Sequence, residues 1–193
     1  MSPDTGGWPL GPHSEELLKK VLENNKTPAV IDADGLNLLA KTDEWGIEQI
    51  RMNPSGYVLT PHMKEMSRLT GYSVQELKDN RRELLRKYTE KVHAVCVLKD
   101  SRTLVKAPEG RLMINTTGNA AMAKAGSGDV LAGMITGLMA QHMRPDDAAV
   151  LGVYLHGLCG DHARKELGSY SVLAGDLLKM LGRTLKELED MTE

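Results

Sequence analysis

Short apolar runs alternate with amphipathic segments along the first half of the chain. Three runs of strand length predict buried strands at residues 28–34, 57–60 and 93–98. Residues 15–24 carry leucines and a valine at helical spacing, which predicts an amphipathic helix capped by Ser14. Ser73 and Glu76 form a capping box that predicts a second helix ending near Lys91.

The second half predicts a hairpin followed by helices. Residues 103–106 and 111–115 flank a Pro-Glu-Gly turn and are expected to pair as two strands. The remaining pattern is helical at residues 127–142, 145–167 and 171–191. Strands that alternate with helices predict an α/β fold with a mostly parallel central sheet.

Polar side chains follow the predicted strands. Asp32 and Asp34 end the first strand, His62 follows the second, and Lys99 follows the third. Because ligands of such sheets bind beyond the carboxyl ends of the strands, we expect one composite site at this edge.

Composition changes this picture little. The net charge of −2 predicts no nucleic-acid partner. No apolar run approaches the roughly 20 residues that span a membrane, so we expect no membrane association. The amino-terminal residues lack the features of a signal peptide. Cys96 and Cys159 lie in apolar surroundings and predict free thiols in a reducing cytoplasm.

The sequence AGSGD at residues 125–129 is the strongest candidate for chemistry. Its small residues let the backbone bend tightly before an apolar helix, and N–H groups at a helix start bind phosphate. Asp129, in the first turn, is placed to remove a proton from a substrate hydroxyl. The alternative is a glycine-rich turn in which Asp129 only stabilises the helix.

Other candidates also have two interpretations. His62 either projects into the site or belongs to a helix cap. Lys99 would be costly without a partner, which a phosphate could supply, or it reaches water. Asp32 and Asp34 alternate on the predicted strand, so they could hold Mg²⁺ or a ribose, or bond neighbouring loops.

Three residues at a spacing of three, His156, Cys159 and His162, suggest a metal site at first sight. Positions three residues apart drift around a helix, and the neighbouring positions are leucine and valine. This pattern favours a core helix, and we predict no metal site built from protein ligands.

Five phrases of the chain resemble, in order, those of the NAD(P)H-hydrate dehydratase family within the ribokinase-like superfamily. They are spread over residues 28–180, which is most of the chain. The phrases are VIDADGLN at 30–37, LTPHMKEM at 59–66, VLK at 97–99, NAAMAKAGSGDVLAG at 119–133 and LGVYLHG at 151–157.

The resemblance implies a ribokinase-like three-layer sandwich and the repair of hydrated NADH and NADPH (NADHX and NADPHX). ATP or ADP, with Mg²⁺, would phosphorylate the hydrate hydroxyl, and phosphate would then leave. Asp129 would be the catalytic base, with His62, Asp129 and Gly11 at the substrate. The implied nucleotide-binding residues are Lys99, Asp100, Ser101, Arg102, Thr103, Asn119, Gly126, Ser127 and Gly128.

The chain departs from the family pattern at its start. Family domains carry further strands before the segment matching Met1, so we expect an amino-terminally incomplete domain whose open edge a second copy covers. Pro9 replaces a glycine of the family's first glycine loop and cannot donate a hydrogen bond. We therefore expect nucleotide to bind better than NADHX. The alternatives are a small-molecule kinase of the same superfamily, in which asparagine tends to replace His62, and an inactive nucleotide-binding fragment.

Overall fold

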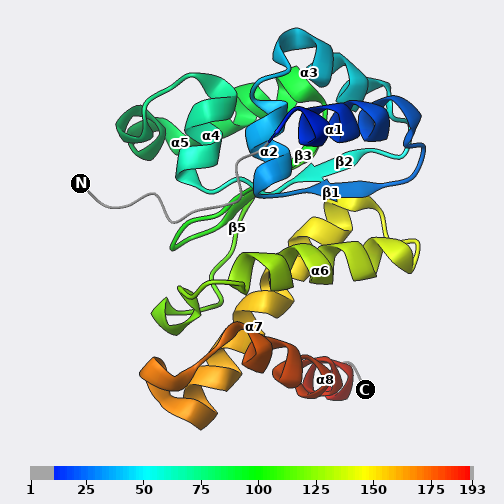
Figure 1. Ribbon diagram of the computed structural model, residues 1–193. Coiled ribbons are helices and arrows are strands. Elements are labelled where there is room, and N and C mark those ends of the chain that lie inside the picture. The colour runs from blue at the N-terminus through cyan, green and yellow to red at the C-terminus, as the bar shows by residue number, and fades with distance from the viewer. Residues whose placement is uncertain (1–10, 192–193) are drawn as a thin grey trace.

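The computed structural model describes residues 11–191. Five strands and eight α-helices alternate along this part of the chain (Figure 1). In order they are α1 (Pro12–Asn24), β1 (Ala29–Ile31), α2 (Asp34–Leu39), α3 (Asp43–Met52), β2 (Tyr57–Leu59), α4 (Met63–Thr70), α5 (Val74–Val92), β3 (Val95–Leu98), β4 (Leu104–Lys106), β5 (Leu112–Ile114), the 3₁₀ turn η1 (Ala120–Met122), α6 (Ser127–Ala140), α7 (Pro145–Ser171) and α8 (Ala174–Asp190).

The five strands form one sheet in the order β1-β2-β3-β4-β5. The first three pair in parallel, and β4 pairs antiparallel with both β3 and β5. Four of the five strands therefore share one direction, which confirms the mostly parallel sheet and the hairpin. The carboxyl ends of β1, β2 and β3 meet at the same edge.

Helices cover both faces of the sheet (Figure 1). The strands alternate between two cores: Leu59 and Leu98 pack under α1–α5, whereas Val58 and Val97 pack against α6 and α7. A third cluster joins α6, α7 and α8 on the outside of the second layer. Three layers result, as predicted.

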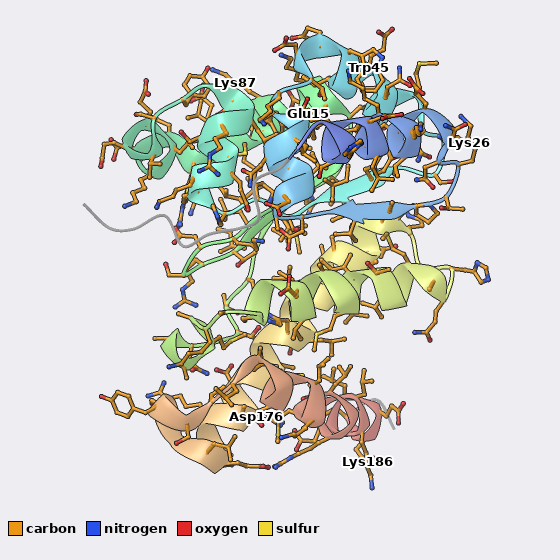
Figure 2. The ribbon with its side chains drawn as sticks, viewed as in Figure 1. Glu15, Lys26, Trp45, Lys87, Asp176 and Lys186 are labelled. Carbon is orange, nitrogen blue, oxygen red and sulfur yellow. The ribbon has the colours of Figure 1, made fainter. Side chains whose placement is uncertain are left out.

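Surface contacts tie the first helical layer together. Helix α1 packs beside α3, where the Lys19 ammonium lies 6.0 Å from the centre of the Trp45 ring (Figure 2).

The capping box of Ser73 and Glu76 begins α5 as predicted. Cys96 and Cys159 are free and buried, also as predicted.

Two local predictions were wrong. Helix α1 begins at Pro12 with Gly11 as its N-cap, so Ser14 lies inside the helix and does not cap it. Strand β1 ends at Ile31, because Ala33 takes a positive φ of 48° that turns the chain into α2. Asp34 therefore begins a helix, and Asp32 and Asp34 do not share a strand face. The short helices α2, α3 and α4 were not predicted.

Helices α6 and α7 approach closely at Gly152. A Cβ atom there would lie 2.7 Å from Cγ1 and 3.4 Å from Cα of the buried Ile135. Gly137, on the exposed side of α6, has nothing within 4 Å of such an atom.

We predict that Gly152→Ala lowers the free energy of unfolding by about 1–3 kcal/mol, because overpacking forces the two helices apart. Gly137→Ala is the control and should raise it by up to about 1 kcal/mol, since alanine is the better helix former. Urea unfolding measures both values. A Gly152→Ala protein as stable as the control variant would contradict the close packing.

Candidate functional site

Three of the polar residues predicted to meet at one sheet edge, Asp32, His62 and Lys99, do meet there. Lys99 follows β3, and its N–H donates to the Pro61 carbonyl at 2.8 Å. His62 and Lys99 form an isolated parallel bridge that continues the sheet past β2 and β3. Thr60 is fully buried beneath them, and its N–H donates to Ile31 at 3.2 Å. The ends of three strands are thus joined at the site.

An ion pair occupies the centre of this edge. Lys99 Nζ lies 2.6 Å from Asp32 Oδ1, and the two side chains are 21% and 13% exposed. Asp32 therefore already supplies a charge partner for Lys99, and a contact of Lys99 with phosphate stays a prediction. A phosphate at this point would share the ammonium with the carboxylate.

The loop at residues 125–129 lies over this ion pair. Gly126 has a φ of 86° and is the N-cap of α6, with no side chain capping the helix. A Cβ on Gly128 would lie 3.5 Å from Lys99 Nζ and 3.7 Å from Asp32 Oδ2. The ammonium and the positive end of the helix dipole therefore converge on one point.

First-turn N–H groups have no partner within a helix. Ser127 N–H donates to the Lys124 carbonyl at 3.2 Å, so this group is occupied. Helical geometry leaves the N–H groups of Gly128 and Asp129 for an anion. The Asp129 carboxylate is exposed in the same turn, as a base acting on a bound substrate requires.

A partly buried histidine on α7 contacts the loop from behind. His156 Nε2 lies 3.3 Å from the Ser127 hydroxyl. Burial lowers the pKa of the imidazole to about 4; a hydrogen bond with the Ser127 backbone opposes this shift, and the nearby Lys99 adds to it. His156 is consequently neutral at pH 7.

The segment before the loop is also tied to α7. Asp161 accepts hydrogen bonds from the Gly118 N–H at 2.9 Å and from Asn119 Nδ2 at 2.8 Å. Asn119 Nδ2 also donates to the Gly160 carbonyl at 2.9 Å, and Asn119 Oδ1 accepts from the Ala121 N–H at 3.0 Å. The Asn119 amide is therefore used within the protein. Asp161 was missed in the sequence, where it is one acid in a long helix.

Glycines on α7 permit this close approach. A Cβ on Gly157 would lie 2.0 Å from Thr117 Oγ1, and one on Gly160 would lie 2.1 Å from Met122 Sδ. Larger residues at these two positions would push the segment at 117–122 off the helix. The surface of α7 therefore sets the path of the chain into α6.

His62 is the N-cap of α4, in agreement with one of its two interpretations. Its Nδ1 accepts from the N–H groups of Lys64 and Glu65, each at 3.1 Å. Nε2 lies 3.4 Å from Glu65 Oε1, and the side chain is 48% exposed. A contact with substrate stays a prediction, as it does for Gly11, the N-cap of α1.

The predicted nucleotide segment at residues 99–103 connects β3 to β4. Asp100 pairs with Arg81 at 3.0 Å and accepts from the Ser101 N–H at 2.8 Å. Arg102 and Thr103 donate to the carbonyls of Thr116 and Asp100, at 3.2 and 3.3 Å. The charge of Asp100 is thus balanced by Arg81, which reduces its repulsion of a phosphate.

The residues at a spacing of three on α7 contact three different partners. His156 contacts Ser127, Cys159 Sγ lies 3.5 Å from Thr184 Oγ1, and His162 Nε2 lies 3.2 Å from Glu187. Within residues 11–191, no group of three His, Cys, Asp or Glu side chains could hold a metal ion. The same residues include no helix long and apolar enough to cross a membrane.

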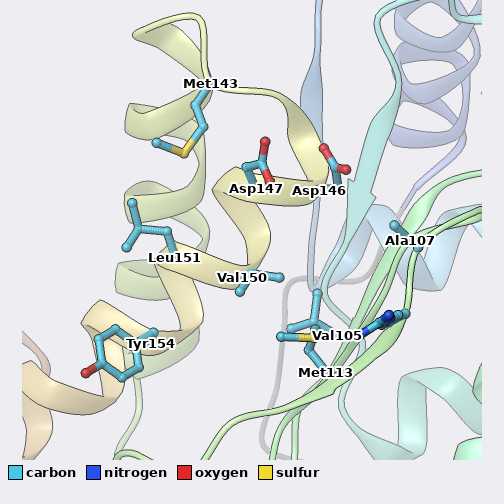
Figure 3. Close-up of a pocket in the computed structure, with 11 residues that line it drawn as sticks. Val105, Ala107, Met113, Met143, Asp146, Asp147, Val150, Leu151 and Tyr154 are labelled. Atoms are coloured by element: carbon cyan, nitrogen blue, oxygen red, sulfur yellow. The ribbon is translucent and has the colours of Figure 1, made fainter.

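A cavity of about 500 Å³ lies between the β4–β5 hairpin and α7, away from this loop (Figure 3). Apolar side chains dominate its lining, which also includes one arginine and two aspartates. Its lining residues are Val105, Ala107, Gly110, Arg111, Met113, Met143, Asp146, Asp147, Val150, Leu151 and Tyr154. None of the predicted site residues is among them.

Solved structures share the fold of this chain. A ribokinase-like superfamily protein from Enterococcus faecalis is 30% identical, with a TM-score of 0.75, over 97% of this chain and 62% of its own. The Bacillus subtilis ADP/ATP-dependent NAD(P)H-hydrate dehydratase, co-crystallised with ATP and Mg²⁺, is 33% identical, with a TM-score of 0.79 over 94% of this chain and 62% of its own. The fold is ribokinase-like.

The family follows from sequence. A family model described as NAD(P)H-hydrate dehydratase matches residues 7–183. A bifunctional NAD(P)H-hydrate repair enzyme from Moorella thermoacetica is 44% identical over 97% of this chain. The chain belongs to the NAD(P)H-hydrate dehydratase family. It spans 34% of the Moorella enzyme and 52% of the ADP-dependent dehydratase from Neisseria meningitidis, which is 37% identical. Residues 7–10 of the first glycine loop lie outside the described residues.

The partly buried His156 predicts a pH dependence of stability. Its pKa is about 4 in the folded protein, against an ordinary value of 6.5, so the unfolded chain takes up the proton first as pH falls. Above pH 6.5 the imidazole is mostly neutral in both the folded and the unfolded chain, so His156 does not reduce the free energy of unfolding. As the pH falls from 6.5 toward 4, protonation of the unfolded chain lowers the free energy of unfolding by an amount that grows to on the order of 3 kcal/mol.

We therefore predict that His156→Gln flattens the loss of stability between pH 6.5 and 4. Urea unfolding at a series of pH values measures the slope. His162→Gln, on the same helix, is the control and should leave this part of the slope in place. Equal slopes for wild type and His156→Gln would show that His156 is not held neutral.

Proposed function

We propose that this chain carries the nucleotide-dependent dehydratase site for NADHX and NADPHX. The terminal phosphoryl group of ATP or ADP passes to the hydroxyl of the hydrate, and elimination of phosphate restores the reduced nicotinamide. The observation that carries the proposal is the convergence of Lys99 and the start of α6 on Gly128. The names of the relatives supply the substrate.

Each group at the loop has a role in this reaction. Asp129 removes the proton of the attacking hydroxyl. The N–H groups of Gly128 and Asp129, with the Gly126 turn before them, stabilise the charge on the moving phosphoryl group. Lys99 neutralises the phosphate beside Asp32. Phosphoryl transfer of this kind depends mainly on position and charge.

The remaining predicted residues have more distant roles. Residues 99–103 border the nucleotide, and Asn119 shapes the loop through its bonds to Gly160 and Asp161. His62, at the same sheet edge, and Gly11 face the substrate. A homo-oligomer and a cytoplasmic location stay predictions.

Mg²⁺ fits this site only when it is bound through the phosphates of the nucleotide. Residues 11–191 contain no group of three protein ligands for a metal, and Asp32 is already paired with Lys99. Mg²⁺ commonly keeps several waters and binds through substrate phosphates, so a protein cage is not required. When bound, the ion supplies further charge neutralisation at the phosphates.

The proposal is tested by incubating the chain with NADHX, Mg²⁺ and either nucleotide. The near-ultraviolet absorbance of the reduced nicotinamide should rise, and phosphate should appear in equal amount. A stable phosphorylated product without recovery of NADH would indicate a small-molecule kinase instead. Nucleotide binding with no turnover of any hydrate would indicate the inactive fragment.

We predict that Asp129→Asn lowers kcat by roughly 10²-fold or more, because the general base is lost while the fold and the backbone donors remain. ADP affinity should stay near that of wild type. Asp147→Asn removes an equivalent first-turn acid from α7 and should leave kcat unchanged. Steady-state kinetics of both variants provide the test; near-normal turnover by folded Asp129→Asn would remove Asp129 from this role.

We predict that Gly128→Val abolishes measurable ADP binding. The added Cβ would lie 3.5 Å from Lys99 Nζ, and the methyl groups beyond it would fill the phosphate position and displace only the flexible end of the lysine, so the protein should fold. Gly133→Val, on the same helix with open space around it, should bind ADP normally. Titration calorimetry compares the two. Unchanged affinity in Gly128→Val would mean that phosphate does not occupy this position.

A further inference from the structure

Polar contact between His156 and Ser127 joins the end of the loop to the helix behind it. The Ser127 hydroxyl lies 3.3 Å from His156 Nε2, and Ser127 is buried at the first position of α6. The next residue, Gly128, lies over Lys99 and Asp32. Any movement of Ser127 therefore moves the N–H groups that face the predicted phosphate.

We propose that His156 is a positioning residue of the phosphate site, holding Ser127 so that the first turn of α6 stays aimed at Lys99. The proposal rests on the proposed function for its ligand, but the contact itself is a feature of the free protein. His156 acts through Ser127 and touches neither nucleotide nor substrate.

The surroundings of His156 explain why a histidine suits this position. Burial lowers its pKa to about 4, so the ring is neutral and offers one donor and one acceptor to the Ser127 hydroxyl and backbone. Lys99 already supplies the cation of the site, and Asp32 balances it. A neutral ring therefore fixes the loop without changing this balance.

Two residues of α7, Asp161 and His156, bind the chain at the start and at the end of residues 118–127. Asp161 binds the start through Gly118 and Asn119, while His156 binds the end through Ser127. Loss of the Asp161 contacts would free the segment at 117–122 first. Loss of the His156 contact would act directly on residues 126–129, where the phosphate is expected.

The first experiment uses the full chain without ligand. We expect His156→Leu to speed hydrogen exchange of the Ser127 and Val130 N–H groups, which donate to the Lys124 and Gly126 carbonyls, about tenfold, the effect of losing one hydrogen bond of about 1.4 kcal/mol. His156→Gln should restore slow exchange, because its amide can reach the place of Nε2. His162→Leu contacts α8 instead and should leave this exchange unchanged. Unchanged exchange in a folded His156→Leu protein would overturn the proposal.

The second experiment measures ADP affinity by calorimetry. His156→Leu and Ser127→Ala should each weaken binding about tenfold, and the double variant should be no weaker than either, because both remove the same contact. Additive losses would overturn the proposal. If wild type does not bind ADP while exchange still responds to His156, the proposed function fails and the positioning role stands.

Discussion

The site depends on one ion pair, formed by Lys99 and Asp32 across the carboxyl edge of the sheet. The two residues follow β3 and β1, so their 2.6 Å contact spans the end of β2 between them. A half-buried lysine without a partner would be costly. The pair removes this cost and leaves the ammonium beneath Gly128, where the start of α6 adds its own positive end. A phosphate that arrives here meets a charge already in place.

Helix α7 gives the loop its shape from behind. Its glycines leave room for the incoming chain, and its polar residues bind that chain at defined points. Gly157 and Gly160 admit the segment at 117–122, Asp161 binds this segment at Gly118 and Asn119, and His156 binds the later Ser127. The backbone at Gly126 then takes a positive φ and enters α6. The second helical layer therefore belongs to the site as much as the sheet edge does.

The sequence predicted the elements whose local signals are strong. The apolar runs at β2 and β3, the Ser73 capping box and the hairpin all have patterns that short-range physics determines. Helices α2 and α4 span only 6 and 8 residues, too few for a clear helical period, and were missed. The end of β1 was misplaced because the φ of 48° at Ala33 has no sequence signal in a non-glycine residue.

Some features of the site could likewise be predicted from the sequence, and others could not. The meeting of the strand ends could be predicted, since parallel strands bring their carboxyl ends together. The partner of Lys99 could not, because Asp32 is 67 residues away and only the register of the sheet joins them. Contacts such as that of Asp161 with Gly118 depend on how α7 packs. Tertiary packing determines these contacts, and the periodicity of apolar residues in the sequence does not predict it.

The most direct test of the central claim is a crystal structure of this chain with ADP. We expect the terminal phosphate within roughly 2.7–3.2 Å of the N–H groups of Gly128 and Asp129, with the Lys99 ammonium shared between phosphate and Asp32. ADP bound elsewhere, for example in the cavity between the hairpin and α7, with Lys99 still engaged by Asp32 alone, would contradict it.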